Sequence, residues 1–136
     1  MVQTPQEQST SQISVLLVDD EVGFVEVLFK RLARRGMAVT VASSGAEGIQ
    51  ALRRQDFDVA VLDLKMEDMD GIEVLKIFKK MAPAMPVIML TGHGSESSAR
   101  QGIQFGAFDY LTKPYELDDL IRKIKEAILQ GGNRDE

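Results

Sequence analysis

Short apolar runs alternate with longer segments of helical periodicity along most of the chain. The runs at 15–18 and 59–62 are almost continuous Val, Leu and Ala, and further runs cover 87–90 and 108–111. An unbroken apolar run indicates a strand that is buried on both faces, as in a parallel sheet. The run at 38–42 alternates in polarity, which predicts an edge strand.

Five segments carry apolar residues three and four positions apart, the spacing of an amphipathic helix. Ser44 and Glu47 have the spacing of a capping box, and Gly36 and Pro83 stand where helices commonly stop. The segment after Ser95 has few apolar residues and is the weakest of the five. The predicted helices cover residues 21–35, 44–55, 70–81, 96–105 and 116–129.

Strands and helices that alternate with short connections predict an α/β fold. We expect a flavodoxin-like (βα)₅ architecture, in which a doubly wound parallel five-stranded sheet has the order 2-1-3-4-5. No internal repeat and no second domain is visible. The predicted organisation is a disordered N-terminal tail at 1–12, one folded domain at 13–130, and a flexible C-terminal tail or linker at 131–136.

Composition excludes several classes of site. The chain has 136 residues, no cysteine and one histidine, which rules out disulfides, thiolate zinc sites and multi-histidine metal sites. No apolar stretch has membrane-spanning length, and the first residues lack the basic and apolar blocks of a signal peptide. We therefore predict a cytoplasmic protein that does not bind membranes.

The charge balance argues against a nucleic-acid partner. The net charge is −5, whereas nucleic-acid binding depends largely on cationic side chains that contact phosphates. The basic residues occur as short groups near the ends of predicted helices, where cations interact well with the helix dipole. These groups are Lys30-Arg31, Arg34-Arg35, Arg53-Arg54 and Lys79-Lys80.

Polar residues follow four of the apolar runs, directly or one residue later. They are Asp19 and Asp20, Asp63, Thr91, and Lys113. The carboxyl ends of parallel strands line one crevice, so these side chains are expected to meet there. Three clustered carboxylates repel one another and raise the pKa of at least one of them unless a cation intervenes. The set suits a Mg²⁺ ion beside an aspartate that carries a phosphoryl group.

The motifs around these residues are Leu-Val-Asp-Asp-Glu at 17–21, Val-Leu-Asp-Leu-Lys-Met at 61–66 with Met-Asp-Gly at 69–71, Met-Leu-Thr-Gly at 89–92, and Gly-Ala-Phe-Asp-Tyr-Leu-Thr-Lys-Pro at 106–114. Any one of them is a weak signal. In this order and at these strand ends, they resemble the receiver domain of two-component response regulators. The resemblance spans residues 13–129.

The resemblance implies that Asp63 is the phosphoacceptor, whose carboxylate attacks a phosphoryl donor and forms an acyl phosphate. It implies Mg²⁺ ligands from Asp20, Asp63 and the backbone carbonyl of Lys65, with Asp19 acting largely through a bound water. The alternative role for Asp63 is a helix N-cap, although Asp70 is better placed for that. One of Asp19 and Asp20 is also a candidate cap for the helix that follows.

The resemblance also assigns the phosphate-binding side of the site. Thr91 is expected to donate a hydrogen bond to a phosphoryl oxygen, Gly92 to leave room for it, and Lys113 to supply positive charge. The Lys113–Pro114 peptide bond is expected to be cis. Thr91 and Tyr110 would form the switch, with the aromatic ring turning inward when the hydroxyl moves to the phosphate. The alternatives are a plain strand threonine, a solvated lysine and a half-buried strand tyrosine.

Two positions depart from the usual pattern or add to it. Glu67 stands where the family usually has proline, and Asp68 follows it. These acids either strengthen the attraction for Mg²⁺ or slow the approach of an anionic donor. His93 is expected to be an exposed loop residue, with a role in orienting water as the alternative. Lys65, two residues after Asp63, is expected to influence how long the phosphoryl group persists.

The function implied is a phosphorelay switch rather than an enzyme. A histidine kinase or histidine phosphotransfer protein would donate the phosphoryl group. A downstream protein partner would bind the face formed by the fourth helix, the fifth strand and the fifth helix. A pseudo-receiver that is never phosphorylated is one alternative. An aspartyl-phosphate phosphatase is another, but it needs a second Asp two residues after the first, where Lys65 stands.

Overall fold

The computed structural model describes residues 12–92 and 96–134. Predictions for residues 1–11, for His93 and for the last two residues therefore lie outside the described residues. Within that part of the chain the strands form one parallel five-stranded sheet in the order β2-β1-β3-β4-β5, which confirms the predicted topology. The strands are β1 (Ser14–Val18), β2 (Ala38–Ala42), β3 (Val59–Asp63), β4 (Val87–Thr91) and β5 (Asp109–Thr112).

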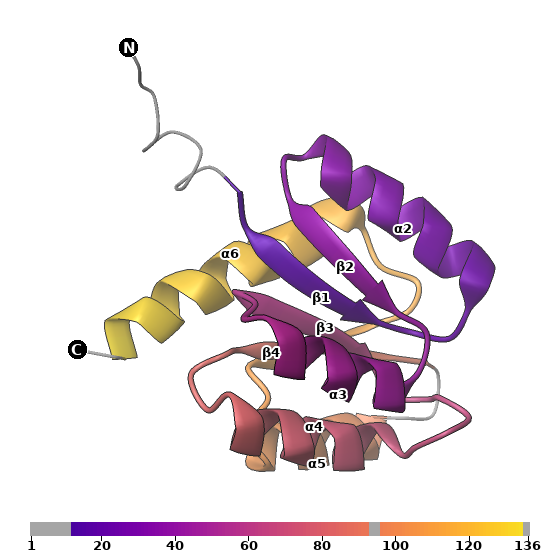
Figure 1. Ribbon diagram of the computed structural model, residues 1–136, viewed down its shortest axis with the longest axis vertical. Coiled ribbons are helices and arrows are strands. Elements are labelled where there is room, and N and C mark those ends of the chain that lie inside the picture. The colour runs from indigo at the N-terminus through magenta and orange to yellow at the C-terminus, as the bar shows by residue number, and fades with distance from the viewer. Residues whose placement is uncertain (1–11, 93–95, 135–136) are drawn as a thin grey trace.

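Helices cover both faces of the sheet. Figure 1 shows α2 and α6 on one side and α3, α4 and α5 on the other, as expected for right-handed crossovers. The helices are α2 (Val22–Arg34), α3 (Gly45–Arg54), α4 (Gly71–Met81), α5 (Glu96–Gln104) and α6 (Leu117–Arg134). In the described part of the chain, no helix combines the length and the apolar character needed to cross a bilayer.

Alternate residues of each inner strand enter different hydrophobic cores, because successive side chains of a strand point to opposite faces. Leu16 and Leu62 pack with α3 and α4, whereas Leu17 and Val61 pack with α2 and α6. Every residue of β3 and β4 is buried, which explains the unbroken apolar runs at 59–62 and 87–90. The alternating strand β2 lies at the sheet edge, as predicted.

Side-chain caps fix the starts of two helices. The Ser44 hydroxyl accepts a hydrogen bond from the Glu47 N–H at 3.1 Å, and the Glu47 carboxylate accepts one from the Ser43 N–H at 2.8 Å. The reciprocal bond of the predicted capping box thus falls one residue earlier than usual. Asp70 accepts a hydrogen bond from the Ile72 N–H at 3.0 Å and caps α4, so the capping alternative considered for Asp63 belongs to Asp70.

A glycine brings the start of α4 against the end of β3. The Gly71 N–H donates to the Leu64 carbonyl at 3.2 Å, and a Cβ at Gly71 would lie only 2.5 Å from the Leu64 Cα. An isolated antiparallel bridge between Lys65 and Asp70 closes the same turn. These contacts join the two ends of the loop that follows Asp63. Asp63 therefore lies directly before a compact turn.

Two element boundaries differ from the predicted ones. Strand β5 covers Asp109–Thr112, one residue later than expected, because its pairing with β4 begins at Ile88 and Asp109. Helix α6 continues to Arg134, past the predicted end at 129 and into the residues 131–134 expected in a flexible tail. Helix propagation adds one hydrogen bond per residue, so even glycine, which costs about 1 kcal/mol, does not end a helix by itself.

Helix α5 buries only small residues. Its buried residues are Ala99 and Gly102. Gly102 lies so close to Met89 of β4 that a Cβ there would overlap the Met89 thioether. A second contact ties α5 to α4, because the Lys76 ammonium lies 4.2 Å from the centre of the Phe105 ring just beyond the helix. The helix predicted to have the fewest apolar residues thus buries only two small residues.

Candidate functional site

The strand ends bring the predicted acidic residues together. Asp19 follows β1 directly, and Asp63 is the last residue of β3. Asp19 is 1% exposed and Asp63 5% exposed, while Asp20 is half-buried beside them. One carboxylate oxygen from each of the three lies within 4.8 Å of the others. Such proximity of buried acids is costly without a cation, which makes this group a candidate metal site.

The environment of Asp63 favours its protonated form. Burial is the largest cause, and the nearby charge of Asp19 adds to it, so that the pKa of Asp63 rises from 3.8 to about 6. The Lys65 N–H, which donates to Asp63 Oδ1 at 3.2 Å, and the Lys113 ammonium both oppose this rise. The raised pKa agrees with the repulsion expected among clustered carboxylates.

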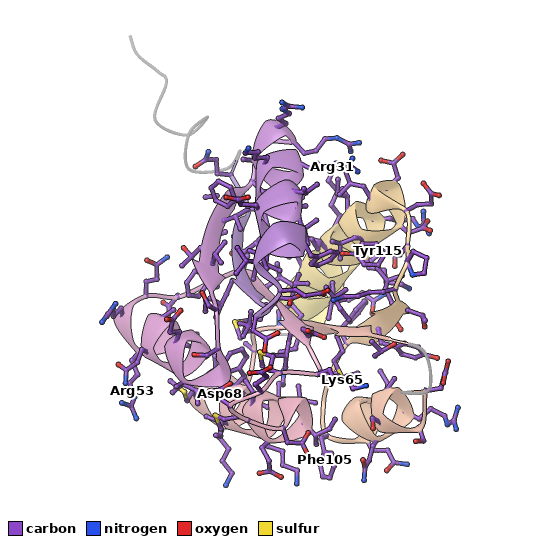
Figure 2. All side chains as sticks on the ribbon, turned by 90° about the vertical axis from the view of Figure 1, so that its right-hand side faces the viewer. Arg31, Arg53, Lys65, Asp68, Phe105 and Tyr115 are labelled. Carbon is purple, nitrogen blue, oxygen red and sulfur yellow. The ribbon has the colours of Figure 1, made fainter. Side chains whose placement is uncertain are left out.

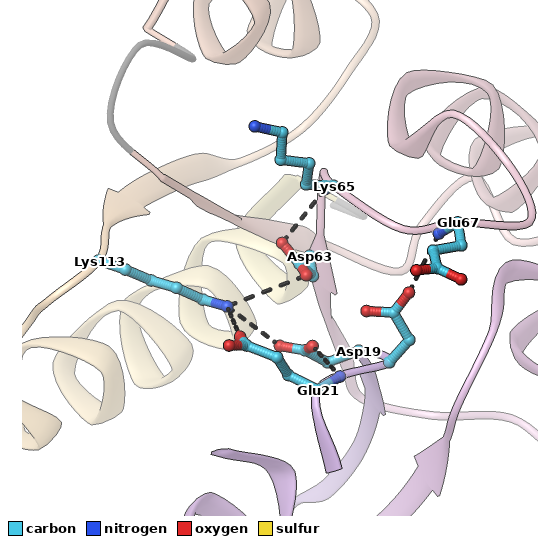
Figure 3. Close-up of polar contacts among 7 residues, drawn as sticks. Asp19, Glu21, Asp63, Lys65, Glu67 and Lys113 are labelled. Carbon is cyan, nitrogen blue, oxygen red and sulfur yellow. Dashed lines mark hydrogen bonds and ion pairs between the residues drawn. The ribbon is translucent and has the colours of Figure 1, made fainter. Parts of the chain in front are cut away.

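Lys113 places its ammonium among the carboxylates, as Figure 3 shows. Its Nζ lies 3.3 Å from Asp19 Oδ2, 3.2 Å from Glu21 Oε1 and 3.9 Å from Asp63 Oδ2. Burial alone would lower the pKa of Lys113, but the charges of Asp19 and Asp63 outweigh it and raise that pKa. The ammonium is therefore a fixed positive charge at the site.

The backbone around Lys113 directs this side chain inward. Its N–H donates to the Thr91 carbonyl at 2.7 Å, which continues the pairing of β4 with β5 past the strand ends. The Lys113–Pro114 peptide bond is cis in the structure. Sequence reasoning had placed both the lysine and this peptide bond at the site.

Two residues of the site escaped the sequence analysis. The Glu21 carboxylate pairs with Lys113, and the Phe24 ring lies with its centre 4.2 Å from the Lys113 ammonium. Phe24 in turn meets the Tyr115 ring edge-to-face at 6.3 Å. The signal for Glu21 was its position directly after the Asp pair. Phe24 lies in the helix predicted at 21–35, but its contact with Lys113 depends on the packing of two segments that are distant in sequence.

Thr91 and Tyr110 occupy the neighbouring strands β4 and β5. Thr91 is 1% exposed, and its Oγ1 is buried without a hydrogen-bond partner among the described residues. Tyr110 is half-buried and packs against the core that contains Met89. A Cβ at Gly92 would meet no atom of the described residues within 4 Å. A buried hydroxyl without a partner is uncommon and marks a place where an acceptor fits.

Asp19 and Asp20 are oriented by backbone amides. Asp19 Oδ1 accepts from the Glu21 N–H at 2.9 Å, and Asp20 Oδ2 accepts from the Glu67 N–H at 3.0 Å. Glu21 is the N-cap residue of α2, and that helix start has no side-chain cap. Neither aspartate therefore caps α2, and the alternative role considered for this pair is wrong.

The donor set fits a hard divalent cation. Three carboxylates supply the oxygen ligands that Mg²⁺ prefers, and a partly open site allows it to keep several waters. Figure 3 shows the Lys65 side chain extending away from these carboxylates, so that only its backbone faces the site. The Lys65 carbonyl as a ligand stays a prediction.

Comparison with known proteins identifies the class. Residues 15–125 match the family model described as the response regulator receiver domain. The chain belongs to this family, as its motifs predicted. The transcriptional regulatory protein GlrR of Escherichia coli strain K12 is 43% identical over 116 residues, which are 85% of this chain and 26% of GlrR. The DNA-binding transcriptional regulator NtrC of Proteus hauseri is 37% identical over 115 residues, which are 85% of this chain and 24% of NtrC.

Solved structures agree with the fold. A receiver domain from Clostridium thermocellum is 36% identical, with a TM-score of 0.84, and the match covers 87% of this chain and 95% of that one. A CheY-like receiver domain protein from Methanospirillum hungatei JF-1 is 31% identical, with a TM-score of 0.86, and the match covers 91% and 99% of the two chains. The chain spans about a quarter of the length of the curated relatives it matches.

Proposed function

We propose that this receiver accepts a phosphoryl group on Asp63 with the help of Mg²⁺, and that phosphorylation changes a surface read by a protein partner. The observation that carries the proposal is the arrangement around Asp63. Its carboxylate is buried beside two further acids and within 3.9 Å of the Lys113 ammonium. A second support is the buried Thr91 hydroxyl, which has no partner among the described residues.

In the proposed reaction, an oxygen of Asp63 forms a bond to the phosphorus of a phosphohistidine. The P–N bond breaks at the same centre, and the imidazole leaves with its electron pair and takes up a proton. Lys113 offsets the negative charge that collects on the phosphoryl oxygens. Asp19, Asp20 and Asp63 would hold Mg²⁺, and the charge of the ion would add to that of Lys113. The donor would be a histidine kinase or a histidine phosphotransfer protein.

The proposed switch couples Thr91 to Tyr110. The Thr91 hydroxyl gains a phosphoryl oxygen as its acceptor, since no described group competes for it. Its movement changes the space beside β5, where Tyr110 is half-buried. A new phosphate thus biases a local two-state element.

The proposed output face comprises α5, β5 and α6, which are the fourth helix, fifth strand and fifth helix of the folded domain. Ile103 near the end of α5 and Phe105 just beyond that helix are each 41% exposed. Across the face, the Lys123 ammonium of α6 lies 2.6 Å from the Asp109 carboxylate of β5. We propose a cytoplasmic protein partner here. Relatives such as NtrC are named as DNA-binding regulators and are about four times as long, whereas this acidic segment is proposed to bind no nucleic acid itself.

The proposal is tested by intact mass measurement after incubation with acetyl phosphate and Mg²⁺. The expected gain is one phosphate, which disappears with a chelator or in Asp63→Asn. Asp56→Asn is the matched control, because it removes an exposed carboxylate elsewhere. Without any gain, a beryllofluoride and Mg²⁺ titration followed by NMR at Thr91 and Tyr110 decides the matter. If both experiments fail, the protein is a pseudo-receiver.

A further inference from the structure

A carboxylate outside the phosphoacceptor cluster links the loop after Asp63 to a distant helix. Asp68 Oδ1 accepts a hydrogen bond from the Gly45 N–H at 3.0 Å, and Asp68 Oδ2 accepts one from the Ala46 N–H at 3.1 Å. Gly45 and Ala46 are the first residues of α3. Figure 2 shows Asp68 beside that helix. Both oxygens of a single carboxylate thus bind a part of the chain more than 20 residues away in sequence.

Helix α3 receives this carboxylate as part of its N-terminal cap. The first N–H groups of a helix have no partner within it, and Ser44 accepts only the one from Glu47. Asp68 accepts hydrogen bonds from the two N–H groups before that of Glu47, which belong to Gly45 and Ala46. The Gly45 hydrogen bond is the main reason that the pKa of Asp68 lies below its usual value, so the carboxylate is charged at neutral pH.

The packing around Gly45 shows that the loop and the helix fit closely. A Cβ at Gly45 would lie 2.8 Å from Val74 Cγ2 and 3.0 Å from Met69 Sδ. Met69 is the residue after Asp68, so two consecutive residues of the loop, Asp68 and Met69, contact the start of α3. Asp68 is itself exposed, so the contact consists of two hydrogen bonds at the surface together with the packing of Met69 against Gly45.

The residue before Asp68 contacts the acidic cluster of Asp19, Asp20 and Asp63. The Glu67 N–H donates to Asp20 Oδ2 at 3.0 Å. Glu67 is bonded directly to Asp68, so the position of its N–H depends on where Asp68 is held. The Glu67 side chain is exposed and makes no hydrogen bond or ion pair among the described residues.

We propose that Asp68 is a positioning residue for the cation site: it anchors the loop so that the Glu67 N–H holds the Asp20 carboxylate toward Asp19 and Asp63. The role rests on the proposed function, in which these three acids bind Mg²⁺. Partners that orient metal ligands typically contribute about 10–100-fold to metal affinity. In this chain a side chain from the loop itself would hold the loop in place, which assigns a role to one of its two adjacent acids.

The test compares Mg²⁺ dissociation constants, measured by calorimetry and by NMR titration of the Asp20 and Glu67 amides. Asp68→Ala is expected to weaken Mg²⁺ binding about ten-fold, and Asp68→Asn to weaken it less, since its one oxygen accepts one of the two N–H groups. Glu67→Ala and Glu67→Gln are the matched controls. They remove the same charge one residue away and are expected to change the affinity less than two-fold, as an estimate for a screened exposed charge.

Ser44→Ala separates positioning from general stability. It removes the other cap of α3 without touching the loop, so it should lower the melting temperature and leave Mg²⁺ affinity unchanged. Before Mg²⁺ is added, the Asp68 variants should already shift the Glu67 and Asp20 amide signals. Equal weakening by the Asp68 and Glu67 substitutions, or unmoved amide signals, would overturn the role of Asp68. If the unaltered protein binds no Mg²⁺, the proposed function itself fails.

Discussion

The Lys113 ammonium lies 3.9 Å from the Asp63 carboxylate, within the range of an ion pair but beyond a hydrogen bond. Its hydrogen bonds go to Asp19 and Glu21 instead, at 3.3 Å and 3.2 Å. The Lys113 ammonium therefore lies beside the phosphoacceptor but donates its hydrogen bonds to Asp19 and Glu21. A phosphoryl group on Asp63 would compete with Glu21 for it, because Glu21 is the exposed member of this set.

Substitution of Lys113 tests this arrangement. Lys113→Met keeps the length of the side chain but removes its charge, so we expect phosphorylation by acetyl phosphate to slow about a hundredfold, as for loss of one charge-stabilising donor. The pKa of Asp63 should rise further, since Lys113 lowers it. Rates come from intact mass against time. Lys113→Arg is the control, and an unchanged rate in Lys113→Met would exclude a role for this charge.

Asp63→Asn should stabilise the protein in Mg²⁺-free buffer near pH 8. The pKa of Asp63 is raised from 3.8 to about 6, so the folded state binds more protons than the unfolded state between these values. Stability then falls as pH rises through that window, by at most about 3 kcal/mol. Asparagine escapes this loss, and we expect a gain of about 1–3 kcal/mol at pH 8 that shrinks toward pH 4.

Urea unfolding at several pH values measures this difference. Added Mg²⁺ should stabilise the unaltered protein more than Asp63→Asn, because the substitution removes one oxygen ligand. A difference in stability that does not vary with pH would mean that Asp63 is not the residue responsible.

The fold was predictable because each of its elements leaves a local signal. Continuous apolar runs marked β1 and β3 as inner strands, and alternation marked β2 as an edge. The acidic cluster was predictable because strand ends of a parallel sheet converge. The contacts of Phe24 and Asp68 were not, since each depends on how two distant segments pack. The end of α6 was missed because glycine weakens a helix without necessarily stopping it.

Thr91→Val should leave the unphosphorylated protein intact and abolish its response. The Thr91 Oγ1 atom is buried without a partner in the described part of the chain, so its replacement by a methyl group should be neutral or stabilising by about 1 kcal/mol. The NMR shift of Tyr110 upon beryllofluoride addition should disappear. Thr91→Ser restores the hydroxyl and should restore the shift. A Tyr110 response that survives in Thr91→Val would separate the two residues.

Two glycines should respond to alanine in opposite directions. Gly71→Ala places a Cβ 2.5 Å from the Leu64 backbone, where little can yield, so we expect a loss of more than about 2 kcal/mol in stability. Gly23→Ala lies in α2 with open space around the new methyl group and should stabilise by about 0.5–1 kcal/mol. Thermal unfolding of both variants checks the pair. Similar melting temperatures would contradict the close packing at Gly71.

The contact of Gly102 with Met89 packs α5 against β4 without a side chain from the helix between them. The buried residues of this helix, Ala99 and Gly102, both have small side chains. The thioether of Met89 is unbranched and adapts to a displaced neighbour. Small translations of α5 along the sheet therefore break few contacts. Thr91 lies two residues beyond Met89 on the same strand, so we expect a rearrangement at the end of β4 to displace α5 as an intact helix rather than to unfold it.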